Sequence, residues 1–234
     1  YDALFFRRKD GSGRTLAEEW KDEDWDAVKG DESLMMEHRM KGTFAGGLSK
    51  PLTYVEIGNE PDLPFTYFWT GTRAQFIAMY QAVAPVLDAQ FGATLKIGAA
   101  SFAWLLGETD PTFLQDFLAG IGTTKLDFVG VHAYQDVPET AFVPQLAKAK
   151  FLRDTLKPLA ELHVPEWGMV LDGGPEFDDM TAALHHAKAL EYFILYDVKL
   201  SHRALARDIV AAPGGLGLLK AGPARAKPAT HVFQ

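Results

Sequence analysis

Short apolar runs alternate with longer amphipathic segments along most of the chain, and this alternation constrains the fold more than any other feature of the sequence. The apolar runs are rich in valine, isoleucine, leucine and glycine, and they cover residues 53–58, 95–100, 128–133 and 162–167. Strands that are covered on both faces have this continuous apolar character. The segments between and after them predict helices at residues 72–91, 111–118, 142–159 and 179–196. This order predicts β/α units around a parallel sheet.

A fifth run, at residues 203–210, falls where the next strand is expected, although Arg207 and Asp208 interrupt it. Asp110 and Pro111 predict the start of the second helix, because aspartate caps helix N-termini and proline suits the first helical position. Five β/α units match part of an eight-stranded barrel, for which about 250 residues are typical. We therefore predict an α/β fold of the TIM-type (β/α)8 barrel class that is incomplete at its N-terminus.

The first 52 residues do not show this pattern. They are rich in charged residues with a few apolar anchors such as Trp20 and Trp25, and they predict one or two surface helices. We therefore divide the chain into an N-terminal helical segment of open placement, residues 1–52, and a barrel region, residues 53–234. A barrel without its opening strands exposes a sheet edge. A second copy of the chain or a missing N-terminal segment is expected to cover that edge.

Composition excludes several classes of protein. The 23 basic and 31 acidic residues give a net charge of −8, which argues against nucleic acid or an anionic membrane as the main partner. The chain has no cysteine, so disulfides, a thiol nucleophile and thiolate metal sites are excluded. No run of about 18 apolar residues predicts a membrane span. The N-terminus lacks a signal-peptide pattern but begins with Tyr1, which is compatible with a periplasmic or secreted protein whose leader was removed.

Two glutamates follow apolar runs at positions suited to chemistry. Pro61 ends its strand directly after Glu60, so Glu60 is expected at the carboxyl end of that strand, where parallel α/β folds bind ligands. Glu166 ends another run and is followed by Trp167, whose indole could stack on a sugar ring. Retaining glycosidases need two carboxyl groups about 5–5.5 Å apart. Taken singly, each feature also fits a structural role, namely a salt-bridged glutamate or a core tryptophan.

Further candidates lie near these glutamates. Asn59 is the only asparagine of the chain and directly precedes Glu60. His132 and Tyr134 lie on one face of a strand by alternation, where they could hold a carboxylate or a sugar hydroxyl, and a core histidine is the alternative. Trp69 and Trp104 follow strand ends and fit either a glycan cleft or packing.

A histidine pair, His185 and His186, occurs in a predicted helix. Adjacent helical residues point about 100° apart, so this pair cannot clamp one metal ion. We predict that both histidines lie on the solvated face of the helix.

Six motifs follow one another in a fixed order along the chain. They are Gly58-Asn-Glu-Pro-Asp, Phe68-Trp-Thr-Gly-Thr, Leu95-Lys-Ile-Gly, Phe128-Val-Gly-Val-His-Ala-Tyr, His163-Val-Pro-Glu-Trp-Gly and Gly214-Gly-Leu-Gly-Leu-Leu with Lys227-Pro228. In this order they resemble clan A glycoside hydrolases, and most of all glycoside hydrolase family 39, which includes β-xylosidases, α-L-iduronidases and exopolysaccharide hydrolases. The resemblance covers residues 53–234, from the fourth to the eighth strand of the family's barrel.

By this resemblance Glu60 is the general acid/base, Glu166 the nucleophile and Asn59 a contact of the sugar 2-hydroxyl, while His132 and Tyr134 match the family's His-Ala-Tyr strand. The resemblance implies retaining hydrolysis of an O-glycosidic bond in an oligosaccharide or polysaccharide, with an exo-β-glycosidase favoured and no metal or organic cofactor. An endo-acting polysaccharide hydrolase and a catalytically degenerate glycan-binding protein are the alternatives. No tryptophan follows Trp167, so the aromatic pair that the family carries on its last strand is not matched.

Overall fold

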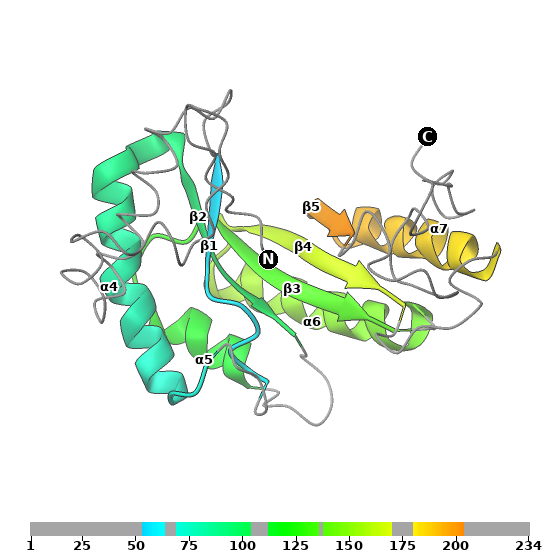
Figure 1. Cartoon of the computed structure of the whole chain (residues 1–234), viewed down its shortest axis with the longest axis horizontal. Coiled ribbons are helices and arrows are strands. Elements are labelled where there is room, and N and C mark those ends of the chain that lie inside the picture. The colour runs from blue at the N-terminus through cyan, green and yellow to red at the C-terminus, as the bar shows by residue number, and fades with distance from the viewer. Residues whose placement is uncertain (1–52, 64–68, 104–111, 136–137, 170–179, 204–234) are drawn as a thin grey trace, which may run out of the picture.

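A computed structural model of the chain describes residues 53–63, 69–103, 112–135, 138–169 and 180–203. Within these ranges the strands form a single parallel sheet in sequence order (Figure 1). They are β1 (Tyr54–Ile57), β2 (Lys96–Phe102), β3 (Phe128–Tyr134), β4 (Glu161–Gly168) and β5 (Val198–Arg203). The helices between them are α4 (Arg73–Phe91), the short 3₁₀ helix η1 (Gly92–Thr94), α5 (Phe113–Gly120), α6 (Pro138–Leu156) and α7 (Met180–Leu195). Neighbouring strands joined by helices in this way form part of a (β/α) barrel.

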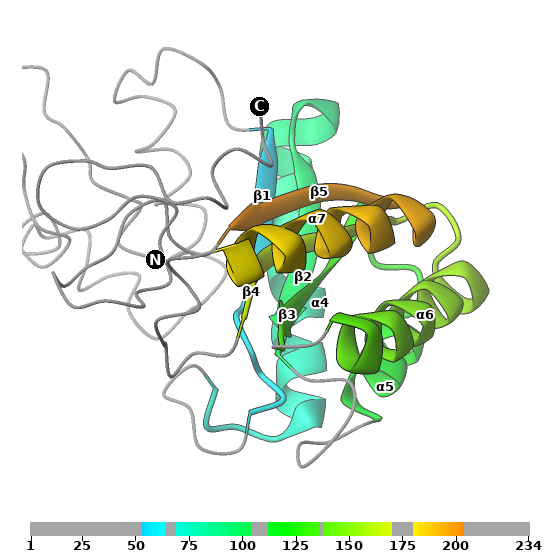
Figure 2. The same cartoon turned by 90° about the vertical axis from the view of Figure 1, so that its right-hand side faces the viewer.

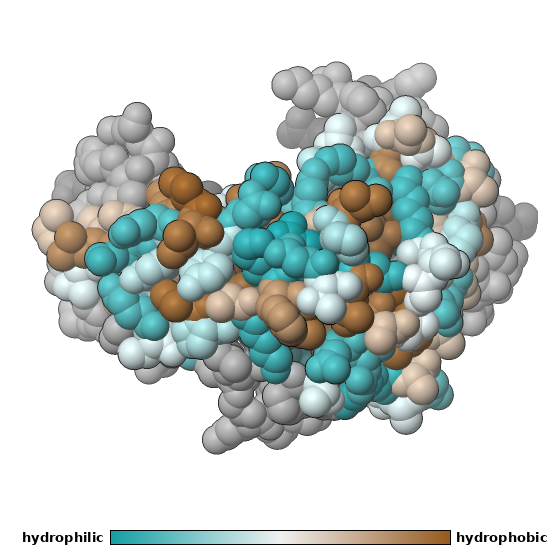
Figure 3. Space-filling model, turned by 180° about the vertical axis from the view of Figure 1, so that it is seen from behind, coloured by the Kyte–Doolittle hydropathy of each residue, from teal (hydrophilic) through white to brown (hydrophobic). Residues whose placement is uncertain are grey.

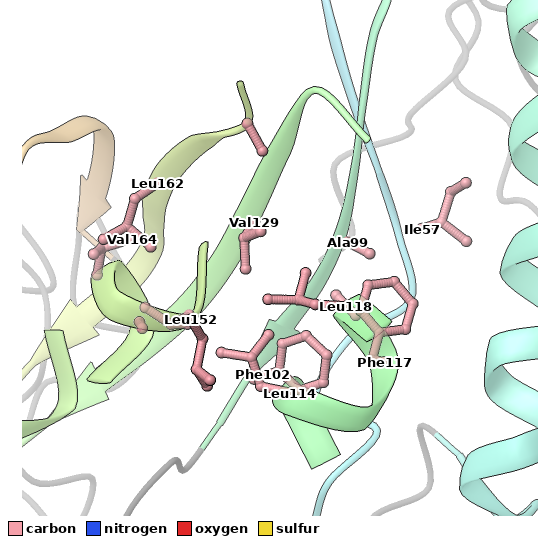
Figure 4. Close-up of a cluster of buried hydrophobic side chains, with 14 of the residues drawn as sticks. Ile57, Ala99, Phe102, Leu114, Phe117, Leu118, Val129, Leu152, Leu162 and Val164 are labelled. Atoms are coloured by element: carbon pink, nitrogen blue, oxygen red, sulfur yellow. The ribbon is translucent and has the colours of Figure 1, made fainter. Parts of the chain in front are cut away.

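The two faces of the sheet differ in chemistry. One face is covered by the four α-helices (Figure 2), and its core contains Ile57, Val129 and Leu162 of the strands together with Phe117 and Leu152 of the helices (Figure 4). Alternation along each strand turns the intervening residues to the opposite face. The register aligns several polar or small residues there, because Glu56 pairs with Gly98 and Gly130 pairs with His163. The helix-covered face therefore holds the apolar core, and the inner face holds the polar side chains.

The four predicted apolar runs are confirmed as β1 to β4, and the four predicted helices are present with shifted ends. The fifth strand was predicted too late: β5 spans Val198–Arg203, and residues 204–210 lie outside the described ranges. Four of its six residues are polar, which hides the strand from a search for continuous apolar runs. Helix α5 begins at Phe113 with Thr112 at the N-cap position, two residues later than predicted, and Asp110 and Pro111 lie outside the described ranges. Residues 1–52 also lie outside the described ranges, and their helical character stays a prediction.

The prediction for the histidine pair of α7 was wrong. His185 and His186 are both buried, and their ring nitrogens lie 2.5 Å from the carbonyl oxygen of Gln135 and 2.6 Å from that of Ala182, respectively. The helix exposes apolar residues such as Leu184 instead. A buried imidazole is tolerated when a carbonyl accepts its N–H, and both histidines meet this condition.

The surface seen from behind mixes polar residues with scattered apolar side chains (Figure 3). Large apolar residues that are exposed include Phe151, Leu159, Leu184 and Ile194. Among the helices of the described ranges, none combines the length and hydropathy that crossing a membrane requires.

Trp167 belongs to the core, so its prediction as a sugar-binding residue was wrong. It is 1% exposed, and its ring lies 5.0 Å from His186 and 5.1 Å from Phe193, measured between ring centroids. Both partners come from α7. Adjacent residues of a strand point to opposite faces, so Trp167 faces the helices when Glu166 faces inward.

Replacing Trp167 by alanine is expected to lower the free energy of unfolding by about 3–5 kcal/mol, because the substitution leaves a cavity between β4 and α7. Urea denaturation followed by circular dichroism measures this loss. Phe151→Ala is the matched control, since Phe151 is an aromatic residue that is 67% exposed, and its replacement is expected to change stability little. Equal losses for the two variants would contradict the core assignment of Trp167.

Candidate active site

The turn after β1 holds Glu60 in an unusual backbone conformation. Glu60 has φ 44°, in the left-handed region that glutamate rarely adopts. Its N–H donates to the carbonyl oxygens of Ala100 at 3.0 Å and Ser101 at 3.1 Å, so the turn is hydrogen-bonded to the end of β2. Gly58 has φ 88°, and a Cβ there would lie 2.8 Å from the Phe76 ring. Backbone strain that the surroundings hold in place is a common feature of functional sites.

The imidazole of His132 lies between two carboxylates. Its Nδ1 is 2.7 Å from Oε1 of Glu60, and its Nε2 is 3.8 Å from Oε2 of Glu166. The side chain is 1% exposed, and Gln145 donates a hydrogen bond to the His132 carbonyl oxygen at 2.7 Å. One buried ring of β3 thus joins the end of β1 to the end of β4.

A bulge in β4 turns Glu166 toward the same side as His132. Gly130 and His132 are two residues apart on β3, but their partners His163 and Glu166 are three residues apart on β4. One extra residue changes the alternation, so His163 and Glu166 both face inward. Pro165 lies inside this irregular stretch, where its missing N–H removes no regular ladder bond. The Tyr134 hydroxyl donates a hydrogen bond to Oε1 of Glu166.

The structure therefore brings together four of the predicted residues, Glu60, His132, Tyr134 and Glu166. Asn59 adjoins them, and its buried Oδ1 has no hydrogen-bond partner among the described residues. A buried acceptor without a partner calls for an explanation, and a hydrogen bond from a bound water or a ligand hydroxyl is one.

The other predicted residues are not part of this cluster. Trp69 is partly exposed, donates from its indole N–H to the carbonyl oxygen of Thr72 at 3.1 Å, and packs edge-on against Phe76. These contacts brace the start of α4. Trp104 lies outside the described ranges, and Trp167 faces the helices. Among the described residues, no group of three or more histidine, aspartate or glutamate side chains is arranged to hold a metal ion.

Glu56 and Ser101 are parts of this region that the sequence reasoning missed. Glu56 Oε1 accepts a hydrogen bond of 2.8 Å from the Ser101 N–H. Burial raises the pKa of Glu56 from its ordinary value of 4.5, and the Ser101 hydrogen bond and the His132 ring partly oppose this effect. A signal was present in the sequence: Glu56 is a carboxylate inside an apolar run, and a charged residue in a covered strand needs a specific reason.

Comparisons with known proteins give a likeness at the level of the fold. No protein-family model matches the chain, and no curated protein is detectably similar to it. Among solved structures, a glucosidase from Croceicoccus marinus aligns with a TM-score of 0.61 and 24% identity over 74% of this chain and 37% of that protein. A family 51 α-L-arabinofuranosidase from Bifidobacterium longum aligns with a TM-score of 0.66 and 16% identity over 83% and 48%, respectively.

An endo-β-1,3-glucanase of family 128 from Amycolatopsis mediterranei aligns with a TM-score of 0.59 and 15% identity, over 86% of this chain and 78% of that protein. The chain spans less than half the length of the first two proteins. All three are glycoside hydrolases, as are family 44 enzymes that align similarly. The described part of the chain is therefore a parallel β/α sheet with the fold of glycoside hydrolase barrels.

Proposed function

We propose that the chain is the catalytic part of a retaining glycoside hydrolase, with Glu60 as general acid/base and Glu166 as nucleophile. The single observation that carries this proposal is the His132 ring, which is hydrogen-bonded to Glu60 and lies 3.8 Å from Glu166, at the carboxyl ends of their strands. In parallel β/α barrels, ligands bind at this end of the sheet. The fold shared with glycoside hydrolases supports the same reaction class.

The contacts suit the two steps of a double displacement. In the first step Glu60 gives its proton to the leaving oxygen while a carboxylate oxygen of Glu166 attacks the anomeric carbon. The Tyr134 hydroxyl orients Glu166 for this attack, and the His132 Nδ1 fixes the Glu60 side chain. Once the sugar is esterified to Glu166, the negative charge there is gone, and Glu60 takes a proton from water as that water attacks. The chain's own side chains thus supply an acid, a base and a nucleophile.

The finer assignment is an exo-β-glycosidase similar to the β-xylosidases of family 39. It is supported by the order of the motifs and by Asn59, whose buried Oδ1 beside Glu60 has no hydrogen-bond partner among the described residues. The substrate would be the end of an oligosaccharide or polysaccharide.

Intact-protein mass after incubation with a panel of activated 2-deoxy-2-fluoro glycosides tests the proposal, because such compounds trap the glycosyl intermediate of a retaining enzyme. We expect one added sugar, mapped to Glu166 by peptide mass spectrometry, because only the nucleophile forms an ester. Glu161→Gln is the matched control: Glu161 is a glutamate of the same strand at its amino end, and this variant should still be labelled. An adduct on another residue, or the absence of any adduct across the panel, would overturn the proposed mechanism.

A further inference from the structure

Glu56 lies on the inner face of the sheet, nearer the amino ends of the strands than the two proposed catalytic residues, Glu60 and Glu166. It belongs to β1, four residues before Glu60, and its carboxylate reaches across β2 to the Ser101 N–H. The register between β2 and β3 explains why this N–H is free for Glu56. Ala99 and Phe102 pair with Val129 and Val131, so β2 carries an extra residue at this point. Ser101, with φ 49°, lies inside the bulge.

The sheet leaves space for this carboxylate. A Cβ added to Gly130 on β3 would lie 1.9 Å from Oε1 of Glu56, which is far inside contact distance. Any side chain at position 130 would therefore displace the Glu56 carboxylate from the Ser101 N–H. The glycine is required because the backbone of β3 lies directly against the carboxylate.

Two connections lead from Glu56 to Glu60. The first is the backbone of Ser101, whose N–H donates to Glu56 and whose carbonyl oxygen accepts from the Glu60 N–H. The second is the charge of the His132 ring, two strands away on β3, which lowers the pKa of the Glu56 carboxyl. The same ring contacts Glu60 and Glu166 through its two nitrogens. The backbone and the side chain of Glu60 are thus both held by groups that interact with Glu56.

We propose that Glu56 is a positioning residue that fixes Glu60 for proton transfer by holding the Ser101 bulge. This inference rests on the proposed function of Glu60, but its structural part does not depend on turnover. The interaction that matters is the acceptor oxygen on the Ser101 N–H. Glutamine supplies the same acceptor and alanine does not.

The structural part is tested first, by carbon NMR of the Glu56 carboxyl and proton NMR of the Ser101 amide across a pH titration of the wild-type chain. We expect both signals to change with one midpoint, above the ordinary value of 4.5, because burial raises the pKa of Glu56. In Glu56→Gln the amide should lose this transition. A Ser101 amide that does not follow the Glu56 titration would overturn the inference, whether or not the chain turns over a substrate.

The functional part is tested with kcat/KM on two substrates, one with a poor leaving group and one with an activated aryl leaving group. Misplacing a catalytic group can cost on the order of 10²-fold, so Glu56→Ala should lose about this much on the poor leaving group. It should lose little on the activated substrate, whose departure needs no proton. Glu56→Gln should recover most of the loss.

Glu161→Ala is the matched control, because it removes a glutamate on the same face at the other end of the strands, where Glu161 pairs with Lys96 and His163. It should change both substrates equally or not at all. Equal losses on both substrates in Glu56→Ala would show a general structural defect and overturn the positioning role. If the wild type hydrolyses neither substrate, the proposed function fails, and the NMR titration alone decides the role of Glu56.

Discussion

Replacing Glu166 by alanine is expected to reduce hydrolysis of every glycoside substrate by roughly 10⁶-fold, the loss found when a catalytic nucleophile is removed. The reason is that no other carboxylate among the described residues lies where Glu166 does, next to the Tyr134 hydroxyl and opposite Glu60 across the His132 ring. Release of the aryl group from a range of aryl glycosides measures the effect. Leaving-group quality should not change it, because every substrate needs the nucleophile.

Azide provides the complementary observation for this variant. A small anion can enter the space that the shortened side chain leaves and attack the anomeric carbon of an activated substrate directly. The product should be a glycosyl azide of inverted configuration, which NMR identifies. An alanine variant that keeps a substantial part of the wild-type rate, or a glycosyl azide of retained configuration, would contradict the assignment of Glu166 as nucleophile.

Replacing Glu60 by glutamine is expected to lower kcat/KM by about 10²–10⁴-fold on substrates with poor leaving groups, the usual contribution of general acid catalysis. Activated aryl glycosides should be spared in kcat/KM, because their leaving groups depart without a proton. Their turnover should still slow after a rapid first release of the aryl group, since the variant lacks the base that activates water. Stopped-flow measurement of aryl release separates these two phases.

The control for Glu60 is Glu161→Gln, the same substitution in a glutamate that lies at the amino end of β4 and pairs with Lys96. This variant should show no dependence on the leaving group. If Glu60→Gln lost the same factor on activated and poor leaving groups, Glu60 would not be the acid. The result would then favour a binding role for Glu60.

Parts of the site followed from local sequence. The expectation that Pro61 ends the strand put Glu60 near the carboxyl end of β1 without coordinates, although β1 itself ends at Ile57 and Glu60 lies in the turn that follows. His132 and Tyr134 are two residues apart in a regular strand, and they do lie on one face with the glutamates. Each of these inferences depends only on neighbours within a few residues.

Other parts depended on contacts that the sequence does not encode locally. The extra residue around Pro165 reverses the alternation of β4, and this bulge decides that Glu166 faces inward while Trp167 faces α7. Of the two histidines of α7, His185 is buried where its ring meets the carbonyl oxygen of Gln135, 50 residues earlier, and His186 is buried against the Trp167 ring of β4. Without those partners the same residue types would be expected at the surface.

The sequence by itself determined the order of strands and helices and the positions of Glu60 and Glu166 at strand ends, because apolar runs, helix periodicity and proline act over short distances. Only the tertiary structure decided which side chains meet. Glu56, Ser101 and Gly130 are separated by 29 to 74 residues in sequence. Even so, the Ser101 N–H donates a hydrogen bond to Glu56, and the Glu56 carboxylate occupies the space where a Cβ of residue 130 would lie. Such contacts depend on the register and bulges of neighbouring strands, and those are fixed when the sheet assembles and packs against its helices.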